Sequence, residues 1–397
     1  MKKVIVISLA AIVALNAASI DEAFVDGKVS GQIRAAYVSQ NNKVDTDTYG
    51  TSIGGILKYE TAAWNDITLG VGAYVSQKLN FATGDFDEGK ANSDLFGEDT
   101  KSYAYIGEGY IDYSANDIAV RVGRQLIDTP FADTDNIRMH PNTFEAAIVT
   151  YTGIEETTLV GGYISGWAGY DSENDISKFK KVAHDSSGVA VIGIINESIE
   201  NLELKGWYYS FDKLTNILYT DASYTIPFDE TNGLELLGQW MKFTEKNNSG
   251  VDGNAYGIGA NITIGMLTLG TAYNEASNDA GKFVISGLGN GPYLVDTEEM
   301  NLDYFEDIKA YLFSAELDME EVGVDGLTLT AIYAGFKSEP VDMKEKEINL
   351  IAMYDINKAL SVEVNYARLE DKNNNTSEDG LYNGGYDRFL VRMNYNF

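Results

Sequence analysis

The chain has 397 residues, of which 44% are hydrophobic and 12% aromatic, and its formal net charge is −31. This acidity argues against nucleic acid as a partner, because phosphates require basic contacts, and the apolar content argues against disorder. Cys is absent, which excludes disulfides and thiolate metal sites and leaves packing and backbone hydrogen bonds to stabilise the fold.

The N-terminus has the pattern of a secretory signal peptide. Two lysines precede an apolar run, residues 4–15, and small residues suited to cleavage near Ala18 or Ser19 follow. The run is shorter than the roughly 20 apolar residues that a membrane helix needs. We therefore predict a signal peptide over residues 1–19 and a single domain over residues 20–397.

Segments in which apolar and polar side chains alternate recur through the rest of the chain. In the first of them Ile33 and Tyr37 fall on one face, while Gln32 and Arg34 fall on the other, which is the period of a strand and not of a helix. About eighteen such segments can be counted, each about ten residues long. They lie near residues 28–40, 50–60, 66–77, 102–114, 117–126, 143–152, 157–167, 187–197, 201–212, 215–226, 233–244, 254–264, 266–277, 307–318, 326–337, 346–355, 359–370 and 386–397.

The connections between these segments alternate between short and long. Short turns such as Glu155-Glu156 suit the periplasmic side of an outer-membrane barrel, and long loops suit its outer side. The long ones are residues 78–101, 127–142, 168–186, 278–306 and 371–385. Together with only 5 prolines, this pattern predicts an all-β fold, a transmembrane antiparallel β-barrel of about 18 strands.

The last segment is the most specific local signal. Its alternating apolar residues end with Met393, Tyr395 and Phe397, and the final residue is aromatic. Such an ending resembles the signal read by the barrel-assembly machinery, and we take these three residues as that signal. The competing interpretation is an edge strand that ends a soluble sheet.

A barrel of this size is too wide for its own side chains to fill, so it leaves an aqueous channel that a loop can narrow. The segment 121–145 combines a strand, a compact loop and both signs of charge, and it is the candidate for an inward-folded constriction loop. Opposed charges across a narrow gap would sort solutes by charge. The alternative is that they form surface ion pairs in an external loop. The candidate residues are Arg121, Arg124, Asp128, Asp133, Asp135, Arg138 and Glu145.

Four stretches resemble OprD-type outer-membrane porins, in particular the form common in Campylobacterota. They are GKVSGQIRAAYV (27–38), LKYETAAWNDITLGVGAYVSQKL (57–79), VRVGRQLIDTPFADTDNIRMHPNTFEAAIVTYT (120–152) and FLVRMNYNF (389–397). The resemblance implies an eighteen-stranded barrel whose inward-folded loop meets a row of arginines, and passive uptake of small nutrients such as amino acids and carboxylates. It also implies that Arg121, Arg124 and Arg138 lie in or near the constriction.

These observations favour a porin for passive diffusion of small polar solutes and ions, placed in the bacterial outer membrane among lipid and lipopolysaccharide. A homotrimer and a monomer are both compatible with the sequence. The alternative function is a structural or adhesive barrel whose long loops bind a partner. No catalytic residue, metal site or cofactor is expected, because His140 and His184 have no partner spacing and no GxSxG occurs. Acidic stretches such as 85–89 are interpreted as solvated loop tips.

Overall fold

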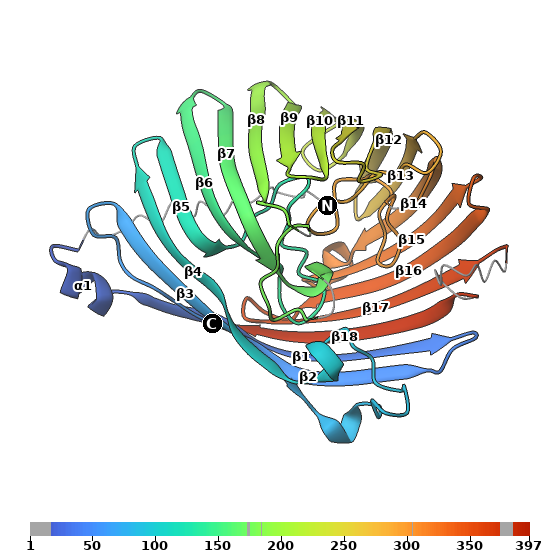
Figure 1. The fold of residues 1–397 in the computed structure, drawn as a ribbon, viewed down its shortest axis with the longest axis horizontal. Helices are drawn as coiled ribbons and strands as arrows, with labels where there is room; N and C mark the ends of the chain where they lie inside the picture. Colours follow the sequence, from blue (N-terminus) through green and yellow to red (C-terminus); the bar gives the residue numbers. More distant parts are fainter. Residues whose placement is uncertain (1–16, 173–174, 184, 304, 374–383) are drawn as a thin grey trace.

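The computed structural model describes residues 17–172, 175–183, 185–303, 305–373 and 384–397, which form one closed antiparallel barrel (Figure 1). Each strand pairs with its neighbours in chain order, and the first strand pairs with the last. The eighteen strands are β1 (Lys28–Asn42), β2 (Thr48–Glu60), β3 (Ile67–Lys78), β4 (Tyr103–Ala115), β5 (Ile118–Gln125), β6 (Thr143–Ile154), β7 (Thr157–Ala168), β8 (Val189–Ile199), β9 (Leu202–Phe211), β10 (Thr215–Pro227), β11 (Gly233–Glu245), β12 (Gly253–Ile264), β13 (Leu267–Ser277), β14 (Ile308–Asp318), β15 (Leu327–Ser338), β16 (Met343–Asp355), β17 (Leu360–Asp371) and β18 (Tyr386–Asn396).

The strand prediction is confirmed in number and in position. Alternation decides which side chains point outward: in β1, Ile33 and Tyr37 are exposed on the outer face, whereas Arg34 and Ala36 are buried on the inner face. An outer face of this kind suits contact with lipid, because apolar groups meet hydrocarbon while every strand has a hydrogen-bonded neighbour on both sides.

In the described residues, short helices lie outside the barrel wall. A six-residue helix, α1 (Ile20–Val25), precedes β1, and the Ser19 hydroxyl accepts a hydrogen bond from the Glu22 amide to cap it. Single 3-10 turns are η1 (Asn80–Ala82), η2 (Glu98–Thr100), η3 (Tyr170–Ser172) and η4 (Glu320–Val322). No helix in the described ranges is long and apolar enough to cross a membrane. Most of the expected signal peptide, residues 1–16, lies outside the described residues.

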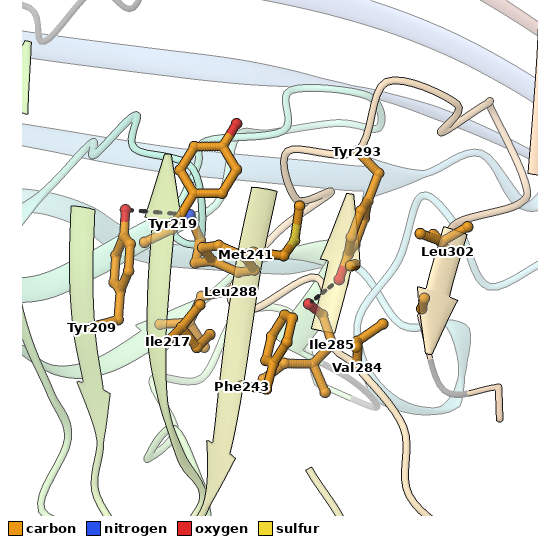
Figure 2. Packing of buried hydrophobic residues seen from close by; sticks show 14 of the residues in the cluster. Tyr209, Ile217, Tyr219, Met241, Phe243, Val284, Ile285, Leu288, Tyr293 and Leu302 are labelled. Atoms are coloured by element: carbon orange, nitrogen blue, oxygen red, sulfur yellow. Dashed lines mark hydrogen bonds between the residues drawn. The ribbon is translucent and has the colours of Figure 1, made fainter. Parts of the chain in front are cut away.

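Two long loops, residues 126–142 and 279–303, fold into the barrel and pack on its inner wall (Figure 1). The ring of Phe131 meets the edges of Tyr209, Tyr219 and Phe243 at centroid distances of 5.4, 5.7 and 5.8 Å. Figure 2 shows the continuation of this packing, where the Tyr293 hydroxyl donates a hydrogen bond to the Ile285 carbonyl oxygen at 2.9 Å.

This packing makes the interior of the barrel asymmetric. On β9 to β11 the inner face carries large apolar side chains, among them Tyr209, Ile217 and Phe243, all of which are fully buried. Protein therefore fills this side of the lumen, where the sequence had led us to expect a wall facing water. Any passage for solutes is displaced toward the opposite wall.

A charged constriction inside the barrel

Three arginines project from the inner wall where the first and last strands meet. They are Arg34 on β1 and Arg388 and Arg392 on β18, and the register pairs Ala36 of β1 with Arg392 and Gln40 with Arg388. Residues two apart on a strand share a face, so alternation places all three side chains in the lumen. Their exposed fractions are 2%, 2% and 7%.

The loop 126–142 binds this arginine row directly. Arg34 Nη1 donates to Asn136 Oδ1 at 2.8 Å and to the Arg138 carbonyl oxygen at 2.5 Å. Arg392 Nη1 donates to the Asn136 carbonyl oxygen at 2.6 Å. The wall thus holds the tip of the loop by charge-assisted hydrogen bonds, which are stronger than bonds between neutral groups.

Acidic side chains from three other segments face the same arginines. Arg388 binds Asp94 at 2.8 Å and Glu299 at 2.7 Å, and Arg392 binds Glu363 of β17 at 2.6 Å. Asp94 lies in the loop after β3 and Glu299 in the loop after β13. The inner wall and the inward loops therefore present fixed charges of both signs along one side of the lumen.

Arg138 completes this group from the loop side. Its Nε lies 3.4 Å from Asp94 Oδ2, and its guanidinium stacks 4.3 Å from the centroid of the Tyr170 ring. Arg138 is 3% exposed. Because Asp94 touches both Arg138 and Arg388, one carboxylate connects the loop cation to the wall cation.

The aspartates of the loop have two different roles. Asp128 accepts hydrogen bonds from the amide and hydroxyl of Thr134, at 3.1 and 2.7 Å, and so fixes the shape of the loop. Burial, together with the neighbouring carboxylates Asp171 and Asp133, raises the pKa of Asp135 to about 9. The surroundings of Asp135 thus favour its neutral, protonated form.

Arg121 lies on the inner wall, away from the arginine row. Its side chain binds Asp112 of β4 at 2.7 Å and stacks 4.2 Å from the Tyr110 ring centroid. A pocket of about 50 Å³ is shared by Arg121, Asp112 and Asp128. The structure thus brings Arg121 together with Asp128, and Arg138 together with the wall arginines.

Arg124 and Glu145 are not brought together with the other candidates. They face each other across the β5–β6 ladder on the outer face of the barrel, with an N–O distance of 3.0 Å. The reason is visible in the sequence: Arg121 and Arg124 are three residues apart in one strand, so period two sends them to opposite faces. The prediction that both arginines lie in or near the constriction conflicts with this rule.

Sequence reasoning did not single out Arg34, Arg388 and Arg392 as site residues. Their inward position could have been inferred from the alternation of the first and last segments. Their meeting depends on closure between strands more than 300 positions apart in the sequence, which no local pattern reports. Asp94 and Glu299 lie in long loops, where no periodicity predicts direction.

The described part of the chain contains no group of three or more His, Cys, Asp and Glu side chains arranged to hold a metal ion. His140 is buried in the loop 126–142, where its Nε2 lies 3.1 Å from the Gly55 carbonyl oxygen and its Nδ1 lies 2.8 Å from the Tyr103 hydroxyl oxygen. These contacts anchor the loop to β2 and β4. His184 lies outside the described residues.

Comparison with known proteins agrees with this architecture. The barrel is similar to Acinetobacter baumannii OccAB2, with a TM-score of 0.81 and 17% identity over 95% of this chain and 99% of that one. It is also similar to Pseudomonas aeruginosa OccK9, with a TM-score of 0.78 and 17% identity over 94% and 99% of the two chains. For Pseudomonas aeruginosa OpdK solved with vanillate, the TM-score is 0.79 and the identity 16%, over 94% and 99%.

A search of curated proteins finds no match. The sequence does match a family model, described as outer membrane porin, OprD family, over residues 22–396. That family comprises channels and is not a class of enzymes. The match spans nearly the whole chain and agrees with the closed eighteen-stranded barrel and its location in the bacterial outer membrane, so this protein belongs to the OprD family of outer membrane porins.

Proposed function

We propose that small polar solutes and ions cross this porin through the lumen beside the inward-folded loops, past the charged cluster that joins these loops to the arginine-bearing wall. The observation that carries the proposal is the charged cluster in which Arg388 of the wall binds Asp94 and Glu299 of the inward loops and Arg392 binds Glu363 of the neighbouring strand β17. Charges fixed in a narrow, partly desolvated passage act on a solute more strongly than charges in bulk water.

The same arrangement favours solutes that carry a carboxylate. Arginine presents a planar set of donors that matches a carboxylate, and a solute carboxylate would take the place of one of the carbonyl or carboxylate oxygens that bind the row along β1 and β18. The solved structure of OpdK with vanillate, an aromatic carboxylate, supports the choice of this chemical class. Arg121, which lies beside Asp112 and Asp128, would be a second polar contact site for a solute in the lumen.

Planar-bilayer recordings test the proposal. Replacing Arg388 and Arg392 together by Gln removes two wall cations, so we expect stepwise conductance to persist and the reversal potential under a salt gradient to shift toward cation preference. Arg368→Gln is the matched control, because Arg368 lies on the outer face of β17 and pairs with Glu370. An unchanged reversal potential in the double variant, or an equal shift in the control, would place the selective step elsewhere.

We also propose that Met393, Tyr395 and Phe397 form the assembly signal and that residues 1–19 are removed on export. All three side chains point outward from β18, and the rings of Tyr395 and Phe397 stack with their centroids 6.4 Å apart. An outward aromatic stripe at the end of the chain is accessible before the barrel closes. This supports a role in recognition by the assembly machinery.

A further inference from the structure

Three lysines form a row on the outer surface of the adjacent strands β14, β15 and β16 (Figure 1). The register pairs Lys309 with Lys337 and Lys337 with Lys344, so these residues lie directly beside one another. Their side chains point outward, because the residues on either side of each lysine are buried on the inner face. Among the eighteen strands that the structure describes, these are the only two cross-strand pairs in which one basic residue faces another.

This lysine row is unfavourable for the barrel on its own. Residues directly opposite in an antiparallel ladder have Cβ atoms about 5 Å apart, and like charges at such positions destabilise a sheet. Neighbouring acids compensate only in part: Lys309 lies 3.2 Å from Glu275 and Lys337 lies 2.6 Å from Glu339. Lys344 has no ion pair with any described residue. Lysine can protect an edge strand from aggregation, but each of these strands is paired on both sides.

The lysine row lies at the outer end of the barrel. Each of the three lysines is one residue from the end of its strand, next to the loop 278–307 or the turn 339–342. The long loops of an outer-membrane barrel are on its outer side. The row is therefore at the level of the outer leaflet, which consists of lipopolysaccharide.

From the lysine row toward the middle of the membrane, the outer surface becomes aromatic and then apolar. Tyr311 of β14 contacts Tyr333 of β15, with ring centroids 6.2 Å apart. Lys346 Nζ lies 5.6 Å from the centroid of the Tyr333 ring. Tyrosine is enriched at the membrane–water interface, and the lysine row is about 7 Å from Tyr311 along the strand. Phe313 and Leu350, which are 54% and 52% exposed, follow at the level of the hydrocarbon.

We propose that the lysine row binds the phosphate groups of lipid A, the acylated glycolipid of lipopolysaccharide. A phosphate over Lys337 would accept hydrogen bonds from the neighbouring ammonium groups and neutralise their repulsion. The side chains of Lys309 and Lys337 are 56% and 55% exposed, so a phosphate can reach them. The acyl chains would lie along Phe313 and Leu350. Because the row faces away from the lumen, this proposal is independent of the route that solutes take.

Native mass spectrometry of the whole protein in nonionic detergent with EDTA tests the proposal. Diphosphoryl lipid A and its phosphate-free analogue are added in equal amounts, and the lipid retained on the protein is quantified. We expect the diphosphoryl form to be retained about tenfold over the phosphate-free form, as one charge-assisted contact would give. Equal retention would mean that only the acyl chains bind. A preference that appears only when Mg²⁺ replaces EDTA would mean that a metal ion bridges the phosphates to the acids; either result would overturn the proposal.

Variants of the lysine row separate it from general lipid contact. Lys337→Gln removes the central charge and should lower the retention of diphosphoryl lipid A about fivefold. The double variant Lys309→Gln with Lys344→Gln should lose the preference between the two lipids. Lys242→Gln is the matched control, because Lys242 is an exposed lysine on β11 that faces uncharged residues on both neighbouring strands. A loss of retention in the control equal to that in Lys337→Gln would contradict a specific site.

Thermal unfolding distinguishes binding from a purely structural role of Lys337. In lipid-free detergent, Lys337→Gln should unfold at a higher temperature than wild type, because it removes repulsion from two lysines, and its exposed pair with Glu339 contributes little. With diphosphoryl lipid A, wild type should be the more stable of the two, because the bound lipid stabilises the folded state. Heat-modifiable migration on gels verifies folding. A variant that is less stable with and without lipid, or a folded variant that retains lipid A as wild type does, would refute the proposal.

Discussion

At the scale of single residues, His140 shows how one buried side chain fixes the constriction loop. Since a carbonyl oxygen only accepts hydrogen bonds, the contact with Gly55 requires the proton on Nε2, and Nδ1 then accepts from the Tyr103 hydroxyl. Burial is the largest factor that lowers the pKa of His140, from 6.5 to about 3. The imidazole is therefore neutral in the folded protein at any ordinary pH.

This gives a prediction for acid stability. The folded protein resists protonation of His140, whereas the unfolded chain takes up a proton below pH 6.5, so stability is present above that pH and is lost as the pH falls toward 3. The loss is about 1.4 kcal/mol for each pH unit in this window. In His140→Gln, the amide can still donate to the Gly55 carbonyl but does not titrate. Urea unfolding at pH 7 and pH 4 should show a smaller acid-induced loss in the variant; equal losses would contradict the assignment.

The two faces of β5 show both the strength and the limit of reasoning from residues. Alternation was sufficient to place Arg121 toward the lumen beside Asp112, and the same rule, applied strictly, sends Arg124 outward to Glu145. The family resemblance implied that both arginines, together with Arg138, lie in or near the constriction. Geometry separates them because a strand has only two faces.

At the scale of elements, the inward loops depend on apolar anchors. Phe131 is fully buried, and its ring contacts three aromatic rings of β9, β10 and β11. Deleting a phenylalanine side chain from such packing costs about 3–5 kcal/mol. The loop 126–142 is held on one side by this ring and on the other by the arginine row, so the position of the constriction depends on both attachments.

We therefore predict that Phe131→Ala loosens the loop without opening the barrel. Single-channel recordings should show larger open-state current noise and a higher mean conductance, whereas heat-modifiable migration should still report a folded barrel. Phe86→Ala is the control, since Phe86 lies in the loop after β3 and is exposed. Identical current traces for Phe131→Ala and wild type would mean that this ring does not position the constriction.

Strands were predictable and loops were not, for a physical reason. In each strand, apolar residues recur at every second position because lipid contacts one face. The boundaries of elements such as β1 and β18 therefore follow from the sequence. On the inner face the environment depends on what the loops do. Leu218 lies between Ile217 and Tyr219, so both faces of β10 are apolar, and nothing local reveals that the inner face is covered by the loop 279–303.

At the scale of the whole molecule, the last residues of the chain take part in closing the barrel. The Phe397 amide donates to the Gly31 carbonyl oxygen at 3.1 Å, and the Gly31 amide donates to the Phe397 carbonyl oxygen at 3.0 Å, so the last backbone group belongs to the closing ladder. The Phe397 side chain points away from the barrel and is not needed for these bonds.

Phe397→Ser should therefore separate assembly from folding. We expect a several-fold lower amount of the protein in the outer membrane of living cells, because recognition of the terminal aromatic is lost. Refolding of the purified, urea-denatured variant into detergent micelles should match wild type, since the backbone bonds persist. Ser361→Ala, a change at a polar strand position, is the control for expression; normal membrane levels of Phe397→Ser would rule out the signal.

The arginine row lies across the seam between the first strand and the last. Arg34 comes from one end of the chain, Arg388 and Arg392 come from the other, and Asn136 bridges them. Pairing of β1 with β18 therefore completes the charged cluster and closes the barrel in the same step. In an intermediate with an open seam, Arg34 is separated from Arg388 and Arg392, so the charged cluster exists only in molecules whose barrel has closed.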